Sequence, residues 1–289
     1  MQETQNMRRV ALPDGSTVPC LGQGTWYLGE KPERRAAECE TLRWGAQNGM
    51  ELIDTAEMYG DGKAEELVGE AIRPLRRESL FLVSKVYPWN AGRRNIFRAC
   101  EDSLQRLGTD YLDLYLLHWR GNVPLRETVE CLRELVRQGR IRRWGVSNFD
   151  RADMEELFSV TGGSECAVDQ VLYHLGSRGV EHDLLPWLRR QHIPLMAYSP
   201  LAQAGTLRRG LAASPAVTQA AAAHGVSPYQ VLLAFVLAQP GVFAIPRASA
   251  LEHVQQNRAA ADLTLSAAEL AALDRAFPAP AHAVPLDMI

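Results

Sequence analysis

Short apolar runs alternate along the chain with longer segments in which apolar positions recur at helical spacing. The runs are rich in Leu, Val, Ile and aromatic residues, and they lack the apolar–polar alternation of a strand with one exposed face. They therefore predict β-strands that are buried on both faces, as in a parallel sheet. Eight runs are predicted as strands, and they begin at Leu21, Leu52, Leu80, Leu112, Ile141, Ala167, Pro194 and Val242.

The segments between these runs have apolar residues three and four positions apart, which is typical of amphipathic helices packed against a sheet. Four such helices are predicted at residues 32–48, 64–72, 92–107 and 124–138. In the last helix the apolar stripe is Leu125, Val129, Leu132 and Val136. Gly139 follows it at a position where a helix end favours a left-handed residue.

The spacing of the predicted strands indicates repeated βα units. From the second strand to the seventh, the strands begin 28, 32, 29, 26 and 27 residues apart, which is about the length of one unit. Eight units in series, with no linker or change of composition, predict an α/β fold of the (β/α)8 TIM-barrel class, with residues 1–289 as a single domain. A doubly wound open sheet is the structural alternative.

Three segments lie outside this count. Residues 8–21 contain two short strand patterns around Asp14-Gly15, which predicts an N-terminal β-hairpin at the bottom of the barrel. An extra C-terminal helix is predicted from Ser266. The seventh and eighth strands begin 48 residues apart, and the additional chain at residues 201–214 follows the carboxyl end of a strand, where barrels build their sites.

The composition of the chain indicates where the protein is located and which partners it lacks. The chain has 31 Lys and Arg against 34 Asp and Glu, a net charge of −3, so we expect no nucleic-acid partner. The five cysteines form no CxxC pair, which indicates reduced thiols and a cytoplasmic protein. The longest apolar run, residues 231–238, is too short to span a bilayer, so we expect no membrane partner. The histidines show no metal-ligand spacing, so we expect no metal. The fold does not require subunit association, so we expect a monomer or a weak oligomer.

Polar side chains that could take part in a reaction follow three successive predicted strands. Asp54 and Tyr59 follow the second strand, Lys85 ends the third and His118 ends the fourth. Because the carboxyl ends of barrel strands meet at one face, we expect these four side chains to lie together. Taken singly, Asp54 could cap a turn, Tyr59 could pack in a loop and His118 could be a core histidine. Lys85 resists such an explanation, since an ammonium group is costly to bury without a partner.

The four side chains suit general acid catalysis at a carbonyl group. A phenol has a pKa near ~10 and is a poor proton donor at neutral pH, but a neighbouring ammonium lowers that pKa. Asp54 would hold Lys85 charged, and a neutral His118 would donate a hydrogen bond to the carbonyl oxygen. The set contains no electron source, so a reduction needs a hydride from a bound nicotinamide.

A series of motifs in fixed order resembles the aldo-keto reductase superfamily: IDTAEMYGDGKAEELVGEAI from Ile53, then VSKV, LLHW, GVSN, DQ and AYSPL. KVYPWNAG, DYLDLYLLHW, GRIRRWGVSN and QVLYHLGSRG are similar to a bacterial methylglyoxal reductase branch of it. The resemblance implies an NADPH-dependent carbonyl reductase of small aldehydes and 2-oxoaldehydes such as methylglyoxal. It also implies roles for the four residues: Tyr59 donates the proton, Lys85 lowers the Tyr59 pKa, Asp54 pairs with Lys85, and His118 orients the carbonyl.

The resemblance further assigns cofactor contacts to residues at the ends of later strands. These residues are Ser147, Asn148, Gln170, Tyr198, Ser199 and Leu201. The first three match positions that bind the nicotinamide carboxamide, the tyrosine matches the aromatic residue that stacks on the ring, and the last two begin the pyrophosphate loop.

The adenine end departs from the family pattern. Arg247 stands where members of the family often have lysine, and His253 stands where they have arginine, whereas Asn257 is retained. Arg247 offers a planar fork suited to the 2′-phosphate of NADPH. The replacement at His253 removes a second fixed cation, so we expect a weaker contact there.

Four aromatic residues near strand ends are candidates for the mouth of a substrate pocket, with ordinary packing as the alternative. They are Trp26, Tyr87, Trp89 and Trp119. Two other functions stay open at this point. One is an NADPH-binding barrel with a redox-sensing or regulatory role, and the other is a lyase that forms a Schiff base through Lys85.

Overall fold

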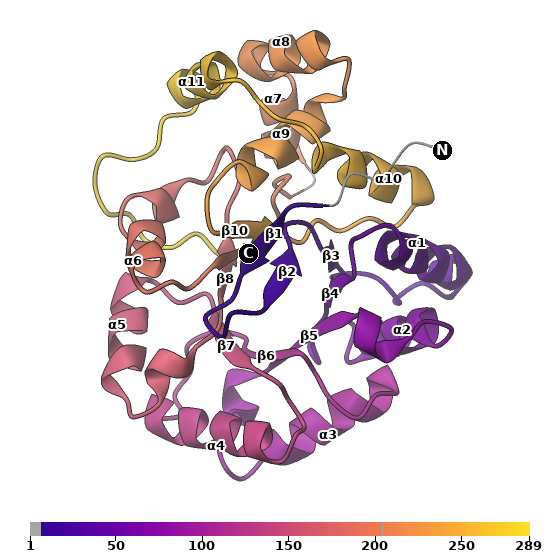
Figure 1. Cartoon of the computed structure of the whole chain (residues 1–289), viewed down its shortest axis with the longest axis vertical. Helices are drawn as coiled ribbons and strands as arrows, with labels where there is room; N and C mark the ends of the chain where they lie inside the picture. Colours follow the sequence, from indigo (N-terminus) through magenta and orange to yellow (C-terminus); the bar gives the residue numbers. More distant parts are fainter. Residues whose placement is uncertain (1–6, 204) are drawn as a thin grey trace.

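The computed structural model describes residues 7–203 and 205–289. Its main sheet consists of eight parallel strands, which confirms all eight predicted runs (Figure 1). These strands are β3 (Gln23–Gly24), β4 (Leu52–Asp54), β5 (Phe81–Val86), β6 (Leu114–Leu117), β7 (Trp144–Ser147), β8 (Asp169–Leu172), β9 (Leu195–Tyr198) and β10 (Val242–Ala244).

The strands lie side by side in the order of the sequence, from β3 at one end of the sheet to β10 at the other. These two end strands meet through parallel bridges between Leu21 and Ala244 and between Gly24 and Arg247. The backbone N–H of Gly22 also donates to the carbonyl of Ala244, at 2.8 Å. The sheet therefore closes into a barrel, which confirms the (β/α)8 class and excludes the open doubly wound sheet.

Helices surround the barrel and bury its outer face (Figure 1). They are α1 (Arg35–Gln47), α2 (Lys63–Ile72), α3 (Ile96–Leu107), α4 (Leu125–Arg137), α5 (Arg151–Ser159), α6 (Leu184–Arg190), α7 (Thr206–Ala212), α8 (Pro215–His224), α9 (Pro228–Leu237), α10 (Leu251–Ala260) and α11 (Ala267–Ala276). Short 3₁₀ helices occur at Pro32–Arg34, Arg77–Ser79, Pro88–Asn90, Gly163–Glu165 and Gly179–Glu181.

The helices predicted from apolar spacing are confirmed, with small corrections. The first three residues of the predicted α4 stripe are buried, but Val136 is 37% exposed. The buried face of α4 also includes Cys131 and Leu135, so it is centred to one side of the predicted stripe and leaves Val136 at its edge in the last turn. Gly139 has the expected positive φ, at 72°. At the other end of the chain, the predicted helix from Ser266 is α11, and the Ser266 side chain caps it.

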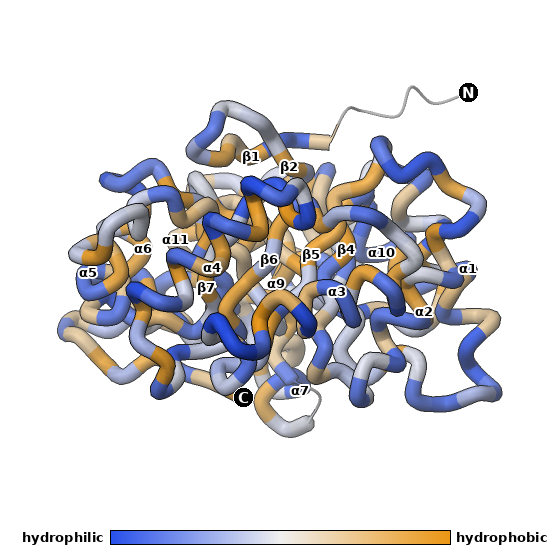
Figure 2. Tube along the Cα trace, turned by 90° about the horizontal axis from the view of Figure 1, so that it is seen from below, coloured by the Kyte–Doolittle hydropathy of each residue, from blue (hydrophilic) through white to orange (hydrophobic). Residues whose placement is uncertain are grey.

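The predicted N-terminal hairpin is also confirmed. β1 (Arg9–Ala11) pairs antiparallel with β2 (Thr17–Pro19), and Gly15 takes a positive φ in the turn between them. Figure 2 shows this hairpin on one side of the barrel, and α7 and the C-terminal end of the chain on the opposite side. The hairpin thus covers the end of the barrel away from the carboxyl ends of the strands, and it leaves the face formed by those ends free.

The additional chain after β9 contains α7, and Ala204 within it lies outside the described residues. The apolar run at residues 231–238 belongs mainly to α9, in which Val231 to Leu237 are all buried. Within the described ranges, no single helix has both the length and the apolar content to cross a membrane. The pair α8 and α9 passes that test only jointly, across a bend of 95°.

Candidate active site

The four side chains predicted from strand ends converge at the carboxyl end of the barrel. Lys85 on β5 is fully buried, and its Nζ donates to Asp54 Oδ2 at 2.7 Å, to the Thr55 carbonyl at 2.9 Å and to Tyr59 Oη at 3.0 Å. The ring of His118 lies edge-on to that of Tyr59, with 5.8 Å between their centroids. The ammonium group therefore has three acceptors in fixed positions, one of them the phenol oxygen.

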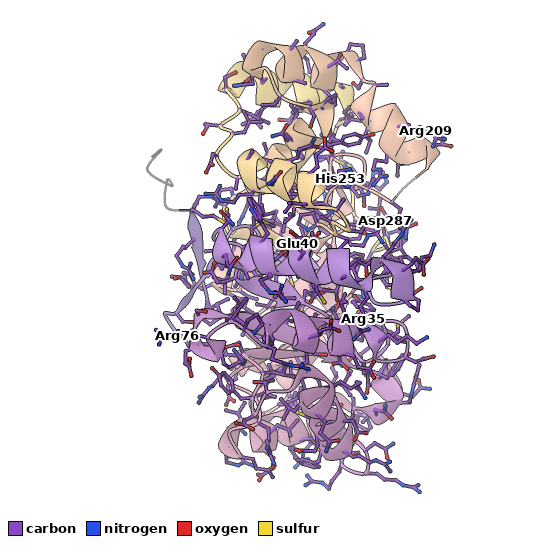
Figure 3. The ribbon with its side chains drawn as sticks, turned by 90° about the vertical axis from the view of Figure 1, so that its right-hand side faces the viewer. Arg35, Glu40, Arg76, Arg209, His253 and Asp287 are labelled. Atoms are coloured by element: carbon purple, nitrogen blue, oxygen red, sulfur yellow. The ribbon has the colours of Figure 1, made fainter. Side chains whose placement is uncertain are left out.

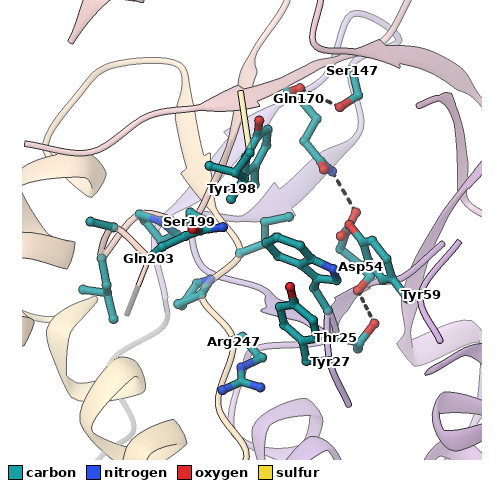
Figure 4. Close-up of a pocket in the computed structure, with 18 of the residues that line it drawn as sticks. Thr25, Tyr27, Asp54, Tyr59, Ser147, Gln170, Tyr198, Ser199, Gln203 and Arg247 are labelled. Carbon is teal, nitrogen blue, oxygen red and sulfur yellow. Dashed lines mark hydrogen bonds between the residues drawn. The ribbon is translucent and has the colours of Figure 1, made fainter. Parts of the chain in front are cut away.

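Adjacent parallel strands explain this convergence. Asp54 is the last residue of β4, and Val83 of β5 is paired with it in the sheet, so Lys85 stands two residues further along the neighbouring strand on the same face. Thr25 secures the loop before Trp26, because its hydroxyl donates to the Asp54 carbonyl at 2.9 Å (Figure 4). The pairing of β4 with β5 thus holds Asp54 and Lys85 next to each other on rigid backbone.

The charges of the buried pair are set by burial and by mutual attraction. Burial by itself lowers the pKa of Lys85, but the Asp54 carboxylate and Tyr59 outweigh it, so this pKa is raised and the ammonium stays charged. Burial raises the pKa of Asp54, and Lys85 and Gln170 oppose that rise. Gln170 contributes through its Nε2, which donates to Asp54 Oδ1 at 2.7 Å.

Tyr59 departs from the expectation based on sequence. Burial raises its pKa, and the attraction of Lys85 offsets only part of that rise, so the net direction is upward. The expected lowering by Lys85 is present as one contribution but is not the larger one. Tyr59 therefore holds its proton at neutral pH, as a general acid must before the reaction.

His118 is neutral in this site. Burial, and then repulsion by Lys85, keep the pKa of its imidazole well below the usual value near 6.5. Its Nδ1 is buried without a hydrogen-bond partner among the described residues. A neutral ring that lines the cavity can donate one N–H to a carbonyl oxygen without adding a charge.

A second hydrogen-bonded group lies beside these residues, on β7, β8 and β9. Ser147 Oγ donates to the Gln170 carbonyl at 2.8 Å (Figure 4). The Tyr198 hydroxyl donates to Asn148 Oδ1 at 2.8 Å. Asn148 Nδ2 in turn donates to the His118 carbonyl at 3.1 Å. The group therefore joins amide side chains and an aromatic ring to the backbone of His118, which directly follows β6.

One cavity of about 380 Å³ brings both groups together. Its lining includes Asp54, Tyr59 and His118 together with Ser147, Asn148, Gln170, Tyr198, Ser199, Leu201 and Arg247. Four lining residues other than glycine have positive φ, namely Tyr27, Asn148, Ser199 and Ala202. Backbone in such conformations is costly and is concentrated at functional sites. The cavity is thus the candidate active site.

Comparison with known proteins agrees with this geometry. Residues 20–277 match the family model described as the aldo/keto reductase family. The chain belongs to this family. As members of it are oxidoreductases, the predicted enzyme class is confirmed.

Named relatives and solved structures cover nearly the whole chain. Methylglyoxal reductase YeaE of Escherichia coli K12 is 58% identical over 273 residues, 94% of this chain and 96% of that protein. Glyoxal reductase of Bacillus subtilis is 35% identical over 92% of this chain and 91% of that protein. A crystal structure of an aldo/keto reductase from Klebsiella pneumoniae in complex with NADP and acetate has a TM-score of 0.95 and 54% identity, and it covers 98% of this chain and 100% of that one.

The three residues predicted to contact the adenine end of the cofactor do not all line the cavity of this aldo/keto reductase. Arg247 lines the cavity, whereas His253 and Asn257 on α10 do not. His253 is exposed and Asn257 is 8% exposed. The departure from the family pattern at His253 therefore concerns a side chain outside the described cavity lining.

The four predicted pocket aromatics do not lie in one cavity. Trp26 lines the cavity with Tyr59, but Trp89 and Trp119 line a separate hollow. Tyr87 stacks on Trp89 with ring centroids 4.3 Å apart, and Trp119 lies 4.9 Å from the His118 ring. These three rings contact one another, and Trp119 also contacts His118. Local sequence does not distinguish such a cluster from the wall of a pocket.

Several lining residues were not predicted from the sequence. They are Gly24, Thr25, Tyr27, Met58, Pro200, Ala202, Gln203, Arg208, Ile245, Pro246 and Ile289. Most lie in loops whose path depends on distant contacts, so sequence spacing gave no signal for them. For Arg208 a signal existed, because it belongs to the additional chain after β9.

The described lining of this cavity contains no cysteine. Across residues 7–203 and 205–289, no three His, Cys, Asp or Glu side chains are grouped so as to hold a metal ion. All five cysteines are free and buried.

Proposed function

We propose that this protein is an NADPH-dependent carbonyl reductase that acts on small aldehydes and 2-oxoaldehydes such as methylglyoxal. The observation that carries the proposal is the contact of Lys85 Nζ with both Asp54 Oδ2 and Tyr59 Oη beside the cavity. The names of two relatives, a methylglyoxal reductase and a glyoxal reductase, support this substrate class.

The cavity residues fit a nicotinamide cofactor. Asn148 and Gln170 carry amide groups and Ser147 a hydroxyl, which together can donate to and accept from a carboxamide. The ring of Tyr198 is available for stacking, and Arg247 can bind a phosphate group. When bound, NADPH supplies a hydride from C4 of its nicotinamide ring to the carbonyl carbon.

Tyr59 is the proposed proton donor. As negative charge develops on the substrate oxygen, the phenol proton moves to that oxygen, and the carbonyl becomes an alcohol. The phenolate that remains lies 3.0 Å from the Lys85 ammonium, which stabilises it. Asp54 keeps Lys85 charged and in place throughout.

His118 is the proposed orienting group. Its neutral ring lines the cavity next to Tyr59, so a substrate oxygen can accept one hydrogen bond from each of them. Two donors from the loops that follow different strands restrict the oxygen to one position.

The position of Lys85 argues against a lyase that forms a Schiff base through this residue. An amine nucleophile must be exposed to substrate and unprotonated. Lys85 is 0% exposed, and its ammonium makes three hydrogen bonds. Among the residues that the structure describes, no particular contact favours a purely regulatory barrel. We propose further that residues 1–289 act as one domain, in a monomer or weak oligomer, in the cytoplasm, where the five buried thiols stay reduced.

A panel of aldehydes, assayed by loss of the NADPH absorbance band, tests the function. We expect turnover of methylglyoxal and of small aldehydes, and slower turnover with NADH. NADPH binding without oxidation by any member of the panel would contradict the proposal.

A further inference from the structure

Asp169 on β8 carries a buried carboxyl group that the proposed reaction does not use. It is paired in the sheet with Val146 of β7 and Leu195 of β9, and all three side chains are buried. Because side chains alternate along a strand, this row faces the helices, whereas the next residue, Gln170, faces the cavity. Asp169 is therefore an acid between two apolar side chains on the outer side of the barrel.

The carboxyl group lies beside the turn of residues 147–149, which joins β7 to α5. The Asp169 side chain is 0% exposed, and neither of its oxygens makes a hydrogen bond of normal geometry with a described residue. The backbone N–H of Phe149 in the turn acts on this carboxyl group, and it has no backbone acceptor within residues 7–203 and 205–289. Buried N–H groups almost always have an acceptor. The Asp169 carboxyl is thus the acceptor available to the turn.

This turn supports two side chains of the candidate active site. Asn148 within it has a φ of 58°, a costly conformation that persists only when the surrounding structure enforces it. The Asn148 side chain donates to the His118 carbonyl at 3.1 Å and accepts from the Tyr198 hydroxyl at 2.8 Å. A displacement of the turn therefore changes the contacts of both His118 and Tyr198.

A negative charge on Asp169 is unfavourable at this place. The charged groups that act on it are Asp150 and Asp153 at the start of α5, and both repel a further negative charge. The Cys166 thiol and the Tyr198 hydroxyl also interact with it, and burial raises the pKa of each, so neither is charged at neutral pH. A buried carboxyl group without a cation keeps its proton. In agreement with this, burial and the two acids raise the pKa of Asp169 well above its usual range.

We propose that Asp169 is a positioning residue for the turn of residues 147–149, and that it holds this turn only while it is protonated. The ionised carboxylate requires water, which reaches a fully buried side chain only when the turn or the start of α5 opens. Opening displaces Asn148 and weakens the binding of NADPH. Loss of the Asp169 proton to solvent at alkaline pH therefore acts as a switch on cofactor binding. The inference rests on the proposed function only for NADPH as the cofactor, and not for the carbonyl compound.

The first test measures the proton that Asp169 holds in the native state. Asp169→Asn has the same shape and cannot ionise. The unfolded wild-type chain loses this proton above about pH 4, so the stability of wild type relative to the variant falls as the pH rises. The ratio of their unfolding equilibrium constants, wild type to variant, should rise about tenfold per pH unit from about pH 5 until the native carboxyl ionises. A ratio independent of pH would overturn the protonated state.

Infrared spectroscopy checks the same proton directly. An uncharged carboxylic acid has a C=O band that a carboxylate lacks. The difference spectrum between wild type and Asp169→Asn at neutral pH should contain this band, and its absence would also overturn the protonated state.

The second test measures the dissociation constant for NADPH by quenching of tryptophan fluorescence, without a carbonyl compound. For wild type this constant should rise about tenfold for each pH unit above the ionisation of Asp169, because only the protonated form is competent to bind. Asp169→Asn should lack this rise. Glu155→Gln, which removes an exposed carboxylate from α5, should retain it. Asp169→Leu fills the same space but accepts no hydrogen bond from Phe149, so it should bind NADPH about tenfold more weakly even at neutral pH.

An equal alkaline rise in wild type and Asp169→Asn would overturn the switch, and wild-type affinity in Asp169→Leu would overturn the positioning role. Thermal unfolding checks that each variant is folded, and the comparison of wild type with Asp169→Asn decides the proposal if the leucine variant is not. The denaturation and infrared measurements need no cofactor. A failure of the proposed function would therefore appear separately, as wild type that does not bind NADPH at neutral pH.

Discussion

Lys85 Nζ donates a hydrogen bond to Tyr59 Oη across 3.0 Å, from a side chain that is fully buried to one that faces the cavity. The contact links the charged interior of the barrel to the place where a substrate binds. It leaves the phenol protonated at rest, since burial raises the Tyr59 pKa more than Lys85 lowers it. The same contact stabilises the phenolate once the proton has left, so its effect is greatest when charge develops.

Tyr59→Phe removes the proposed proton donor and keeps the ring. We expect the turnover of methylglyoxal to fall by about 10²-fold or more, the usual contribution of general acid catalysis. The dissociation constant for NADPH should stay close to the wild-type value, because the phenol makes no proposed cofactor contact. Steady-state rates and fluorescence titration check both parts. Retained turnover in this variant would contradict the mechanism.

The Lys85–Asp54 pair gives a prediction about stability. Lys85→Met leaves a buried carboxylate without its cation, which should lower the free energy of unfolding by about 3–5 kcal/mol. The double variant Asp54→Asn, Lys85→Met removes both charges and should recover much of this loss while staying inactive. Urea denaturation and turnover measure the two effects. A double variant as unstable as Lys85→Met would show that the unpaired charge is not the cause.

From the low pKa of His118 we predict how kcat/KM for an aldehyde behaves at mildly acidic pH. Burial and Lys85 hold this pKa well below 6.5, so the ring stays neutral as the pH falls from about 8 to about 6. The profile of kcat/KM for an aldehyde should therefore lack an acid limb near pH 6.5. His118→Gln should lower the rate without changing the shape of the profile. An acid limb in the wild type that disappears in His118→Gln would refute the neutral assignment.

His174 gives a pH dependence of stability. Burial lowers its pKa to about 4, and Nδ1 accepts a hydrogen bond from the Gly176 N–H, which requires an unprotonated nitrogen. The unfolded chain takes up this proton near pH 6.5, so the free energy of unfolding decreases as the pH falls from there to about 4. The loss at that lower limit is about 3 kcal/mol.

His174→Gln keeps an acceptor for Gly176 and removes the titration. We expect urea denaturation of this variant to show a smaller loss of stability between pH 6.5 and pH 4 than wild type does. Identical acid dependence in His174→Gln and wild type would mean that other groups control it.

Arg247→Ala tests the 2′-phosphate contact. The dissociation constant for NADPH should rise about tenfold or more, and that for NADH should change little, because NADH lacks this phosphate. His253→Ala should have a smaller effect, since His253 is exposed and lies outside the cavity lining. Equal weakening of both cofactors in Arg247→Ala would remove this residue from the 2′-phosphate.

Much of the site was predictable because it lies at strand ends. Asp54, Lys85 and His118 follow apolar runs that can be recognised locally, and parallel strands bring their carboxyl ends to one face. Tyr59 lies only five residues beyond β4, so its position is tied to the same end. The motifs around these residues also carry the family resemblance, which the comparison with known proteins confirms.

The positions of the pocket aromatics in loops were harder to predict from the sequence. Trp26 and Trp119 both come near strand ends, yet only Trp26 lines the cavity. The direction of such a side chain depends on contacts with rings from other segments, as in the stack of Tyr87 on Trp89. Local spacing contains no information on those contacts.

The sequence by itself determined the eight strands, the hairpin, the placement of Asp54, Lys85 and His118 at one barrel face, and the family. These follow from patterns that are repeated along the chain and from the cost of burying a lone ammonium group. Only the tertiary structure decided the net direction of the Tyr59 pKa and the entry of Arg208 into the cavity, while Arg209 beside it faces outward (Figure 3). Both depend on burial and on side-chain direction, which are set by segments far apart in the sequence.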